Sequence, residues 1–348
     1  MQNRPARSSR RPLLLILTGL AIAGLVAVLI PGAAPARSAY AFPRYGAHND
    51  VSTPFNVSHI PTLARTRFDG GQLRIRSTLW ETPGHRMQEI VYRSAGRQVT
   101  GSISVPQGPG PFPVVVMAHG YVDPAVYFSG ATLEREQAYL ADAGYVVVQT
   151  DYRNYGGSFT EPRGRTVRRP RGYAEDLINL VRAVRSARLP YADTSRLALF
   201  GRSMGGGVVL NALAARPRLA HAAVLYSPLS ASMTDNYRHF VGTRRTHRQL
   251  SERIEGAFGT PRTRPRYWRQ ISSDSYLHRI TIPVQIHHGL ADAKTLPRWS
   301  RRTASRLKAG GAPVDLRFYA GEAHKFSSRW SDFMHSTRTF LDHSLGRV

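Results

Sequence analysis

A glycine-rich turn between two apolar runs is the feature that most constrains how this chain folds. The β-forming residues 197–200 lead into Gly201-Arg202-Ser203-Met204-Gly205-Gly206-Gly207, and a helix-like run from Val208 to Ala215 follows. This context predicts a strand, a sharp turn and a helix. The glycines two residues before and after Ser203 leave room for backbone strain and close packing. We therefore expect the hydroxyl of Ser203 to stand exposed above the end of a sheet, as a nucleophile does.

An acid and a histidine follow Ser203 in the order that a catalytic serine needs. A serine hydroxyl is a poor nucleophile unless a base lies within hydrogen-bond reach and an acid fixes the tautomer of that base. Asp292 comes shortly after one apolar strand-like run, and His324 shortly after the next. Nucleophile, acid and base in this order are typical of the α/β-hydrolase fold. Asp315 and Glu322 are weaker acid candidates, because Asp315 lies inside a predicted strand and Glu322 is close to the histidine.

Two backbone N–H groups are candidates for stabilising the oxyanion of an acyl transfer. One donor normally belongs to the residue after the nucleophile, and the other to the loop after the third strand. These residues are Met204 and Tyr121, which follows His119-Gly120. The loop 151–158 also follows a predicted strand end, and it is expected near the site because open parallel sheets bind ligands beyond their carboxyl ends.

Strands and helices alternate along most of the chain, which predicts βαβ units, a parallel sheet and right-handed crossovers. Three β-like segments come first and are expected to be antiparallel edge strands, the second and third joined by the hairpin signal Ala95-Gly96. The predicted fold class is α/β: an α/β-hydrolase fold with a mostly parallel central sheet, antiparallel N-terminal strands, helices on both faces and a helical lid insertion. The expected strands are Leu73–Glu81, Glu89–Ser94, Val99–Val105, Val114–Ala118, Tyr145–Gln149, Leu197–Phe200, Ala222–Tyr226, Val284–His288 and Val314–Tyr319, and the expected helices are Leu133–Ala143, Ala174–Ala187, Val208–Ala215, 296–307 and 327–345.

The segment from about 230 to 275 interrupts this alternation and predicts a lid over the mouth of the site. From Ala231 to Ile280 there are 10 arginines and 4 acids, so the mouth is expected to be positive and to concentrate anionic ligands. The alternative is that these arginines follow a compositional bias and point to water. Four aromatic residues of the lid are expected to line an acyl pocket: Phe240, Phe258, Tyr267 and Trp268.

The N-terminal 41 residues have the pattern of a targeting or anchoring segment. Met1 to Arg11 carries arginines and no acid, and Leu13 to Ile30 is an apolar run. Small residues follow and fit a cleaved secretory signal, whereas the length of the apolar run also fits a retained membrane anchor. Either reading places the body of the protein outside the cytoplasm, secreted or tethered to the membrane. We expect a linker or loosely packed arm at 42–72 and the hydrolase domain at 73–348.

Composition excludes several chemistries. The chain has no cysteine, so it has no disulfide, thiolate metal site or cysteine nucleophile. No H-E-x-x-H motif or spaced ligand cluster indicates a metal, and Gly205-Gly206-Gly207 lacks the lysine and the spacing of a nucleotide site, so no cofactor is expected.

The net charge is +26, and every Lys or Arg residue except Lys294, Lys308 and Lys325 is arginine. A polyanion is the alternative partner for such a chain. However, the sequence contains no nucleic-acid-binding motif, and we do not expect it to bind nucleic acid.

From about residue 87 to 343 the chain resembles the α/β-hydrolase catalytic domain of the prolyl oligopeptidase family, close to bacterial members described as dipeptidyl aminopeptidase-like or acylaminoacyl peptidase-like. The resemblance implies a serine hydrolase that acts through Ser203, Asp292 and His324. The residues that carry it are Glu89 to Pro106, Val114 to Gly120, Asp151-Tyr152-Arg153 with Gly156-Gly157-Ser158, Tyr173-Ala174-Glu175-Asp176, Gly201 to Gly207, Asp292 and His324.

The chain departs from that family at its N-terminal side. Classical members place a β-propeller before the hydrolase domain, and in dipeptidyl peptidases the propeller supplies acids that hold the substrate amine. Here only residues 42–72 and one predicted strand separate the leader from the resembling region. Peptide specificity therefore does not transfer, and a small ester and a short peptide stay open as substrates. The competing hypothesis is a basic, surface-associated binding protein on a degenerate hydrolase scaffold.

Overall fold

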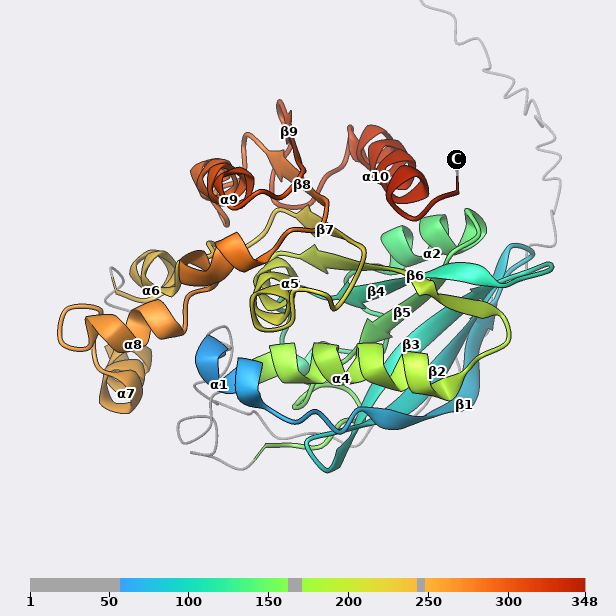
Figure 1. Cartoon of the computed structure of the whole chain (residues 1–348), viewed down its shortest axis with the longest axis horizontal. Helices are drawn as coiled ribbons and strands as arrows, with labels where there is room; N and C mark the ends of the chain where they lie inside the picture. Colours follow the sequence, from blue (N-terminus) through green and yellow to red (C-terminus); the bar gives the residue numbers. More distant parts are fainter. Residues whose placement is uncertain (1–56, 162–170, 243–247, 348) are drawn as a thin grey trace, which may run out of the picture. The chain divides into compact units, whose positions relative to one another are not determined.

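Nine strands form one sheet in the order β1-β2-β3-β5-β4-β6-β7-β8-β9 in the computed structural model, which describes residues 57–161, 171–242 and 248–347 (Figure 1). The predicted leader at 1–41 lies outside these residues. Within them, no helix combines the length and the apolar character needed to cross a membrane.

The N-terminal edge of the sheet is antiparallel, as predicted. Strand β1 (Gly71–Glu81) pairs with β2 (His85–Ser94), and β2 pairs with β3 (Arg97–Pro106). The hairpin between β2 and β3 turns at Ala95 and Gly96, which have φ values of 53° and 76°. Strand β3 then pairs antiparallel with β5, so this edge joins the rest of the sheet directly.

The rest of the sheet is parallel and is covered on both faces. Every residue of its strands β5, β7 and β8 is buried, as expected for strands between two helical layers. The parallel strands are β4 (Phe112–Ala118), β5 (Val146–Thr150), β6 (Ala192–Arg202), β7 (Ala222–Tyr226), β8 (Val284–Gly289) and β9 (Val314–Tyr319).

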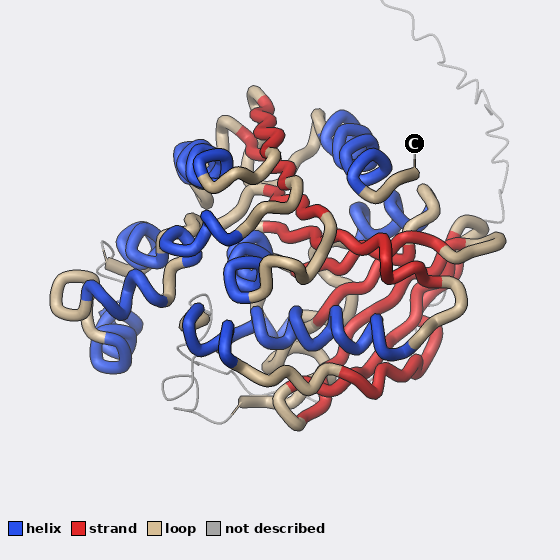
Figure 2. Tube along the Cα trace, viewed as in Figure 1, coloured by secondary structure: helices blue, strands red, loops and turns tan. Residues whose placement is uncertain are grey.

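Two apolar cores hold the helices to the sheet, one on each face (Figures 1 and 2). The larger core packs α4 (Gly172–Ala187), α5 (Met204–Ala215) and α9 (Pro297–Ala309). The second core packs α2 (Glu134–Asp142) and α10 (Trp330–Ser344). The predicted α/β class, with antiparallel N-terminal strands and helices on both faces, is confirmed.

The described part of the expected linker is packed, which corrects the prediction of a loose arm. Helix α1 (Ile60–Arg65) buries Ile60 and Leu63, one turn apart, and contacts α5. Arg216 donates a hydrogen bond of 2.8 Å from Nη2 to the carbonyl oxygen of Thr66. Helix α1 is only six residues long, which is too short to produce a periodic apolar pattern.

The insertion after β7 is helical, as predicted. It contains α6 (Met233–Phe240), α7 (Arg248–Phe258), α8 (Pro265–Gln270) and the 3-10 segment η3 (Ser273–Arg279). Helices α6, α7 and α8 share an apolar cluster apart from the two main cores, and they lie beside one another in Figure 1. The segment η3 contacts α5. The lid is therefore a small packed unit and not a single flap.

Candidate active site

Ser203 lies at a strained turn between β6 and α5. Its φ and ψ are 55° and −119°, a conformation that non-glycine residues rarely adopt. The turn also requires Gly205, since a Cβ on that residue would lie 1.9 Å from the carbonyl oxygen of Ala118 at the end of β4. The predicted strand, turn and helix are therefore present, and the helix starts one residue after the serine.

The three residues predicted for the catalytic chemistry lie together beyond the carboxyl ends of parallel strands. Nε2 of His324 lies 2.9 Å from Oγ of Ser203, and Nδ1 of the same ring lies 2.8 Å from Oδ2 of Asp292. Ser203 follows β6, Asp292 follows β8 and His324 follows β9. Asp292 is buried, whereas the side chain of His324 is 14% exposed and is open to the site.

The carboxylate of Asp292 is fixed by its own loop. Its Oδ1 accepts hydrogen bonds from the backbone N–H groups of Lys294 (2.8 Å) and Thr295 (2.9 Å). Its Oδ2 lies 2.7 Å from Oγ1 of Thr295 and 3.2 Å from Nε2 of His288. Burial alone would raise the pKa of Asp292, but the hydrogen bonds from His288, His324 and Thr295 outweigh it and hold this pKa well below the usual range. The carboxyl group is thus an anion.

Thr295 and His288 were not among the sequence candidates, although one weak signal was available. An Asp followed by a backbone turn and a Thr three residues later is typical of a side chain that accepts hydrogen bonds from its own loop. His288 lies at the end of β8 and is held by Oγ of Ser300 at 2.7 Å. Its contact with Asp292 depends on how β8 and α9 pack, which no local pattern specifies.

The two weaker acid candidates lie elsewhere. Asp315 in β9 accepts hydrogen bonds from Gln285 (2.9 Å) and Arg317 (2.8 Å). Glu322 accepts from the backbone N–H groups of Ser327 (2.8 Å) and Arg329 (2.6 Å), so it shapes the loop that carries the histidine. Neither carboxylate contacts the ring of His324.

A cavity of about 310 Å³ is lined by Ser203 and His324. Tyr121 and Met204, whose backbone N–H groups were predicted to stabilise the oxyanion, line it as well. Met204 is the first residue of α5, where backbone N–H groups have no partner within the helix. Gly120 approaches the serine closely, since a Cβ there would lie 3.2 Å from Cβ of Ser203. The backbone next to Tyr121 thus borders Ser203.

The lid forms one wall of this cavity, but fewer of its aromatic residues line the wall than predicted. Leu229, Ala231, Met233 and Ile271 line the wall, together with Phe240. The other three predicted aromatics do not line it: Phe258, Tyr267 and Trp268. They turn inward because the lid helices are amphipathic and need an apolar centre of their own; the rings of Phe258 and Tyr267 stack at 5.8 Å.

The arginines of the lid do not line the cavity in the described part of the chain, and most of the described ones are exposed, which is what the alternative of a compositional bias predicts. The two cations that do line it come from outside the lid, Arg202 from the end of β6 and Lys294 from the loop of Asp292. None of the described lining residues is Asp or Glu.

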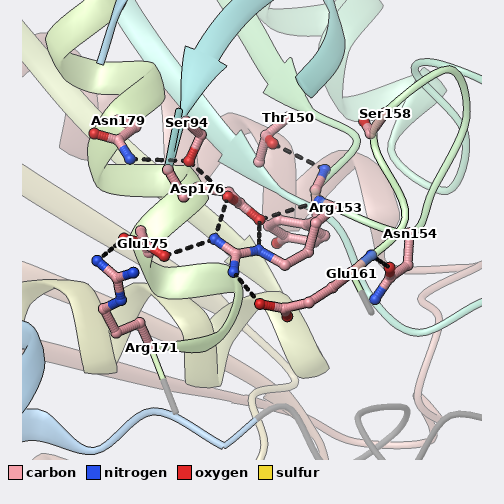
Figure 3. Close-up of polar contacts among 12 residues, drawn as sticks. Ser94, Thr150, Arg153, Asn154, Ser158, Glu161, Arg171, Glu175, Asp176 and Asn179 are labelled. Atoms are coloured by element: carbon pink, nitrogen blue, oxygen red, sulfur yellow. Dashed lines mark hydrogen bonds and ion pairs between the residues drawn. The ribbon is translucent and has the colours of Figure 1, made fainter. Parts of the chain in front are cut away.

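The loop 151–158 supports the site without lining it. Arg153 is buried and pairs with Asp176 (2.7 Å), Glu175 (2.8 Å) and Glu161 (3.1 Å), as Figure 3 shows. This buried network ties the loop to α4. From the same loop, Oη of Tyr155 donates to the carbonyl oxygen of Val122 (3.1 Å), next to Tyr121.

Asp151, at the start of that loop, is hydrogen-bonded to the segment that follows Tyr121. Its carboxyl group contacts the hydroxyls of Tyr127, Ser129 and Thr100. Burial raises the pKa of Asp151 to about 6, although these three hydrogen bonds lower it. The ring of His119 stacks on Tyr127 at 4.7 Å, and burial lowers the pKa of His119 to about 4, so this imidazole is neutral at pH 7.

Residues 131–347 match the model of the prolyl oligopeptidase family. A curated relative from Bacillus subtilis (strain 168), the uncharacterized peptidase YtmA, is 26% identical over 243 residues, which are 69% of this chain and 87% of the relative. Among the described residues, no group of three or more His, Cys, Asp or Glu side chains is arranged to hold a metal ion.

Two solved structures illustrate the fold. Acetyl xylan esterase 1 from Thermoanaerobacterium sp. JW/SL YS485 gives a TM-score of 0.59 at 17% identity, covering 81% of this chain and 92% of that one. The acylaminoacyl peptidase of Pyrococcus horikoshii gives 0.57 at 19% identity, covering 80% of this chain and 48% of that one. At these identities the likeness shows the fold, which is the expected α/β-hydrolase fold.

Proposed function

This chain belongs to the prolyl oligopeptidase family and is a serine hydrolase, and we propose that Ser203, His324 and Asp292 carry out its reaction on a small ester or amide of a carboxylic acid. The observation that carries the proposal is the unbroken path of contacts from Oγ of Ser203 through the imidazole to the carboxylate, at 2.9 and 2.8 Å. These distances are those of a nucleophile, a base and an orienting acid.

The first half of the reaction forms an acyl-enzyme. The anionic Asp292 holds the proton of His324 on Nδ1, which leaves Nε2 free to accept the proton of Ser203. Oγ then attacks the substrate carbonyl, and the backbone N–H groups of Met204 and Tyr121 stabilise the oxyanion. When the tetrahedral intermediate collapses, Nε2 returns the proton to the leaving oxygen or nitrogen, and the bond to the acyl carbon breaks.

The second half returns the enzyme to its starting state. A water molecule gives one proton to Nε2 of His324 and attacks the acyl carbon, which forms a second oxyanion in the same position. Collapse breaks the bond to Oγ of Ser203, which takes the proton back from Nε2. The products are a carboxylic acid and an alcohol or amine.

The cavity supports a small acyl group more than a dipeptide with a free amine. Its volume of about 310 Å³ is at the low end for ligand sites. An aminopeptidase needs a carboxylate to hold the substrate amine, and no described residue lining the cavity supplies one. A peptidase is the second candidate, because the curated relative from Bacillus subtilis is named as one.

Labelling with a fluorophosphonate probe tests the catalytic proposal. Wild-type protein is expected to bind the probe at Ser203, and Ser203→Ala is expected to lose both labelling and ester hydrolysis. Ser186→Ala is the matched control, since Ser186 lies on α4 outside the cavity. Hydrolysis that persists in Ser203→Ala, or a folded wild type that is never labelled, would favour the basic binding protein on a degenerate scaffold instead.

A substrate panel separates the two candidate bond types. Nitrophenyl esters of increasing acyl length are compared with aminoacyl and acylaminoacyl anilides. We expect ester turnover to exceed anilide turnover by a larger factor than chemical reactivity explains. Anilide turnover equal to or above ester turnover would identify a peptidase.

We also propose that residues 1–41 direct the hydrolase domain, 73–348, out of the cytoplasm. The support is the arginine-rich start and the apolar run from Leu13 to Ile30. N-terminal sequencing of protein recovered from culture medium and from membranes distinguishes a cleaved signal from a retained anchor. Recovery of the whole chain in the cytoplasmic fraction would contradict the proposal.

A further inference from the structure

The cavity at Ser203 is lined by two positive side chains, Arg202 and Lys294, and by no described acid. Such a cavity favours an anionic ligand, because positive groups at a partly enclosed site attract negative charge. Arg202 is the more constrained of the two, since it directly precedes the nucleophile at the end of β6.

The guanidinium of Arg202 is held by contacts that leave part of its hydrogen-bonding capacity unused. It lies over the ring of Tyr226, 5.5 Å from the ring centre, and its Nη1 donates to the carbonyl oxygen of Thr132 at 3.1 Å. Nε is buried and has no hydrogen-bond partner. Within the described residues the side chain of Arg202 makes no ion pair. The nearby carboxylate of Glu136 lies 3.9 Å from Nη2 of Arg135 and accepts a hydrogen bond from Nε1 of Trp330.

Thr132 shows two further unusual features at the same place. Its Oγ1 is a second buried polar atom without a partner, and the residue lines the cavity together with Arg202. Its φ is 74°, an outlier for a β-branched residue. Backbone strain and unpaired polar atoms gather at ligand-binding positions more than elsewhere. Here both occur in residues that are hydrogen-bonded to each other.

The position of Arg202 indicates which part of a substrate it meets. The hydroxyl of Tyr226, beneath the guanidinium, accepts a hydrogen bond from the backbone N–H of Phe326, two residues after His324. Arg202 therefore lies on the side of the histidine loop, from which the leaving group receives its proton. The lid residues Met233 and Phe240 form a different wall of the cavity.

We propose that Arg202, held by Thr132, binds a carboxylate on the leaving group of the substrate. The substrates would then be esters or amides whose leaving group carries a carboxylate near the scissile bond, such as O-acyl hydroxy acids or N-acyl amino acids. This inference rests on the proposed hydrolase function and adds a substrate class to it. Arginine suits the role because its planar donors match a carboxylate in two hydrogen bonds.

Three 4-nitrophenol-type esters, one neutral and two with a single carboxylate in different places, test the proposal. They are 4-nitrophenyl acetate, 5-acetoxy-2-nitrobenzoate with a carboxylate on the leaving phenol, and mono-4-nitrophenyl adipate with a carboxylate at the far end of the acyl chain. Each kcat/KM is divided by the uncatalysed rate of the same ester. We expect wild type to prefer the second ester over the first by at least about tenfold, and Arg202→Gln to lose that preference. The third ester should show no such dependence on Arg202.

Arg301→Gln is the matched control. Arg301 also lies over an aromatic ring, 4.6 Å from the centre of Phe318, but it does not line the cavity. Its variant is expected to keep the wild-type preference. The inference is overturned if wild type shows no preference for the second ester, or if Arg202→Gln keeps that preference. It is also overturned if Lys294→Gln loses the preference and Arg202→Gln does not. If Nε of Arg202 only holds a water molecule, Arg202→Gln would keep the preference.

A binding measurement keeps the inference separate from catalysis. In Ser203→Ala, calorimetry compares 5-hydroxy-2-nitrobenzoate with 4-nitrophenol, the leaving groups with and without the carboxylate. Tighter binding of the first, lost in Ser203→Ala/Arg202→Gln, supports the carboxylate site even if no ester is turned over. Equal binding of the two phenols refutes the site even if the hydrolase function holds.

Discussion

Nδ1 of His324 lies 2.8 Å from Oδ2 of Asp292, although the two residues are 32 positions apart. They meet because β8 and β9 are parallel neighbours, so the loops that follow them start at the same edge of the sheet. Gly289 at the end of β8 allows the two loops to touch, since a Cβ there would lie 2.2 Å from the carbonyl oxygen of Glu322. The contact between these two side chains is thus a consequence of strand order.

Asp292→Asn is expected to reduce kcat by about 10⁴-fold while the protein stays folded. An amide oxygen at the position of Oδ1 still accepts from the backbone of Lys294 and Thr295. The amide nitrogen, however, faces Nδ1 of His324 and favours the wrong tautomer. Ester hydrolysis and urea unfolding measure the two effects. Asp315→Asn serves as the control; if it reduced kcat as much as Asp292→Asn does, Asp292 would not be the orienting acid.

Gly205→Ala is expected to lower the free energy of unfolding by about 3 kcal/mol or more, because its Cβ would lie 1.9 Å from the carbonyl oxygen of Ala118. Gly207→Ala in the same helix tests the specificity of this clash. A Cβ on Gly207 would meet Leu229 at an ordinary 3.5 Å, so its free energy of unfolding should change by no more than about 1 kcal/mol. Equal losses in the two variants would mean that the turn does not depend on contact with β4.

The sequence predicted the sheet and the three catalytic candidates because both depend on short-range patterns. The segments predicted as strands at 197–200, 284–288 and 314–319 lie in β6, β8 and β9 of the structure. Ser203, Asp292 and His324 each follow one of these strands, and parallel strands bring their carboxyl ends to one edge. Once the strands are known, the meeting of these side chains needs little further information.

Contacts that depend on packing between distant segments were not predictable in the same way. The unpaired Nε of Arg202 results from how Tyr226 and Thr132 surround it. The inward orientation of Phe258 and Trp268 depends on the lid having a core of its own. A list of aromatic residues in a segment does not say which face of each helix they occupy, and short amphipathic helices bury their rings against each other before they line a cavity.

Phe240→Ala is expected to shift acyl preference toward longer chains. Phe240 lines the cavity, and its truncation leaves space that an acetyl group does not fill but a hexanoyl group does. The ratio of kcat/KM for 4-nitrophenyl hexanoate to that for the acetate should rise about tenfold. Phe258→Leu is the control, since this ring lies in the lid cluster. If the control shifts the ratio as well, lid stability and not cavity shape sets the acyl preference.

The pH dependence of stability should reveal the buried carboxyl group of Asp151. Burial raises its pKa in the folded protein to about 6, whereas in an unfolded chain it lies near ~3.9. Below the lower value both states hold the proton, and the folded state bears no penalty from this group. Between the two values the unfolded chain loses its proton first, so the contribution of Asp151 to stability falls as pH rises and is lost above about 6.

Asp151→Asn removes this titration, so the free energy of unfolding of the variant relative to wild type is expected to rise between pH 4 and pH 7. The rise should be on the order of 3 kcal/mol, which is the free-energy equivalent of the difference between the pKa of Asp151 in the folded protein and its pKa in the unfolded chain. Asp193→Asn is the control, because the hydrogen bond from Ser195 shifts the pKa of Asp193 in the opposite direction, to below its usual value. The free energy of unfolding of this variant relative to wild type should therefore not rise between pH 4 and pH 7. Urea unfolding at four pH values measures both differences. A difference between Asp151→Asn and wild type that stays flat, or that falls with pH, would show that the carboxyl group is already ionised in the folded protein at pH 4.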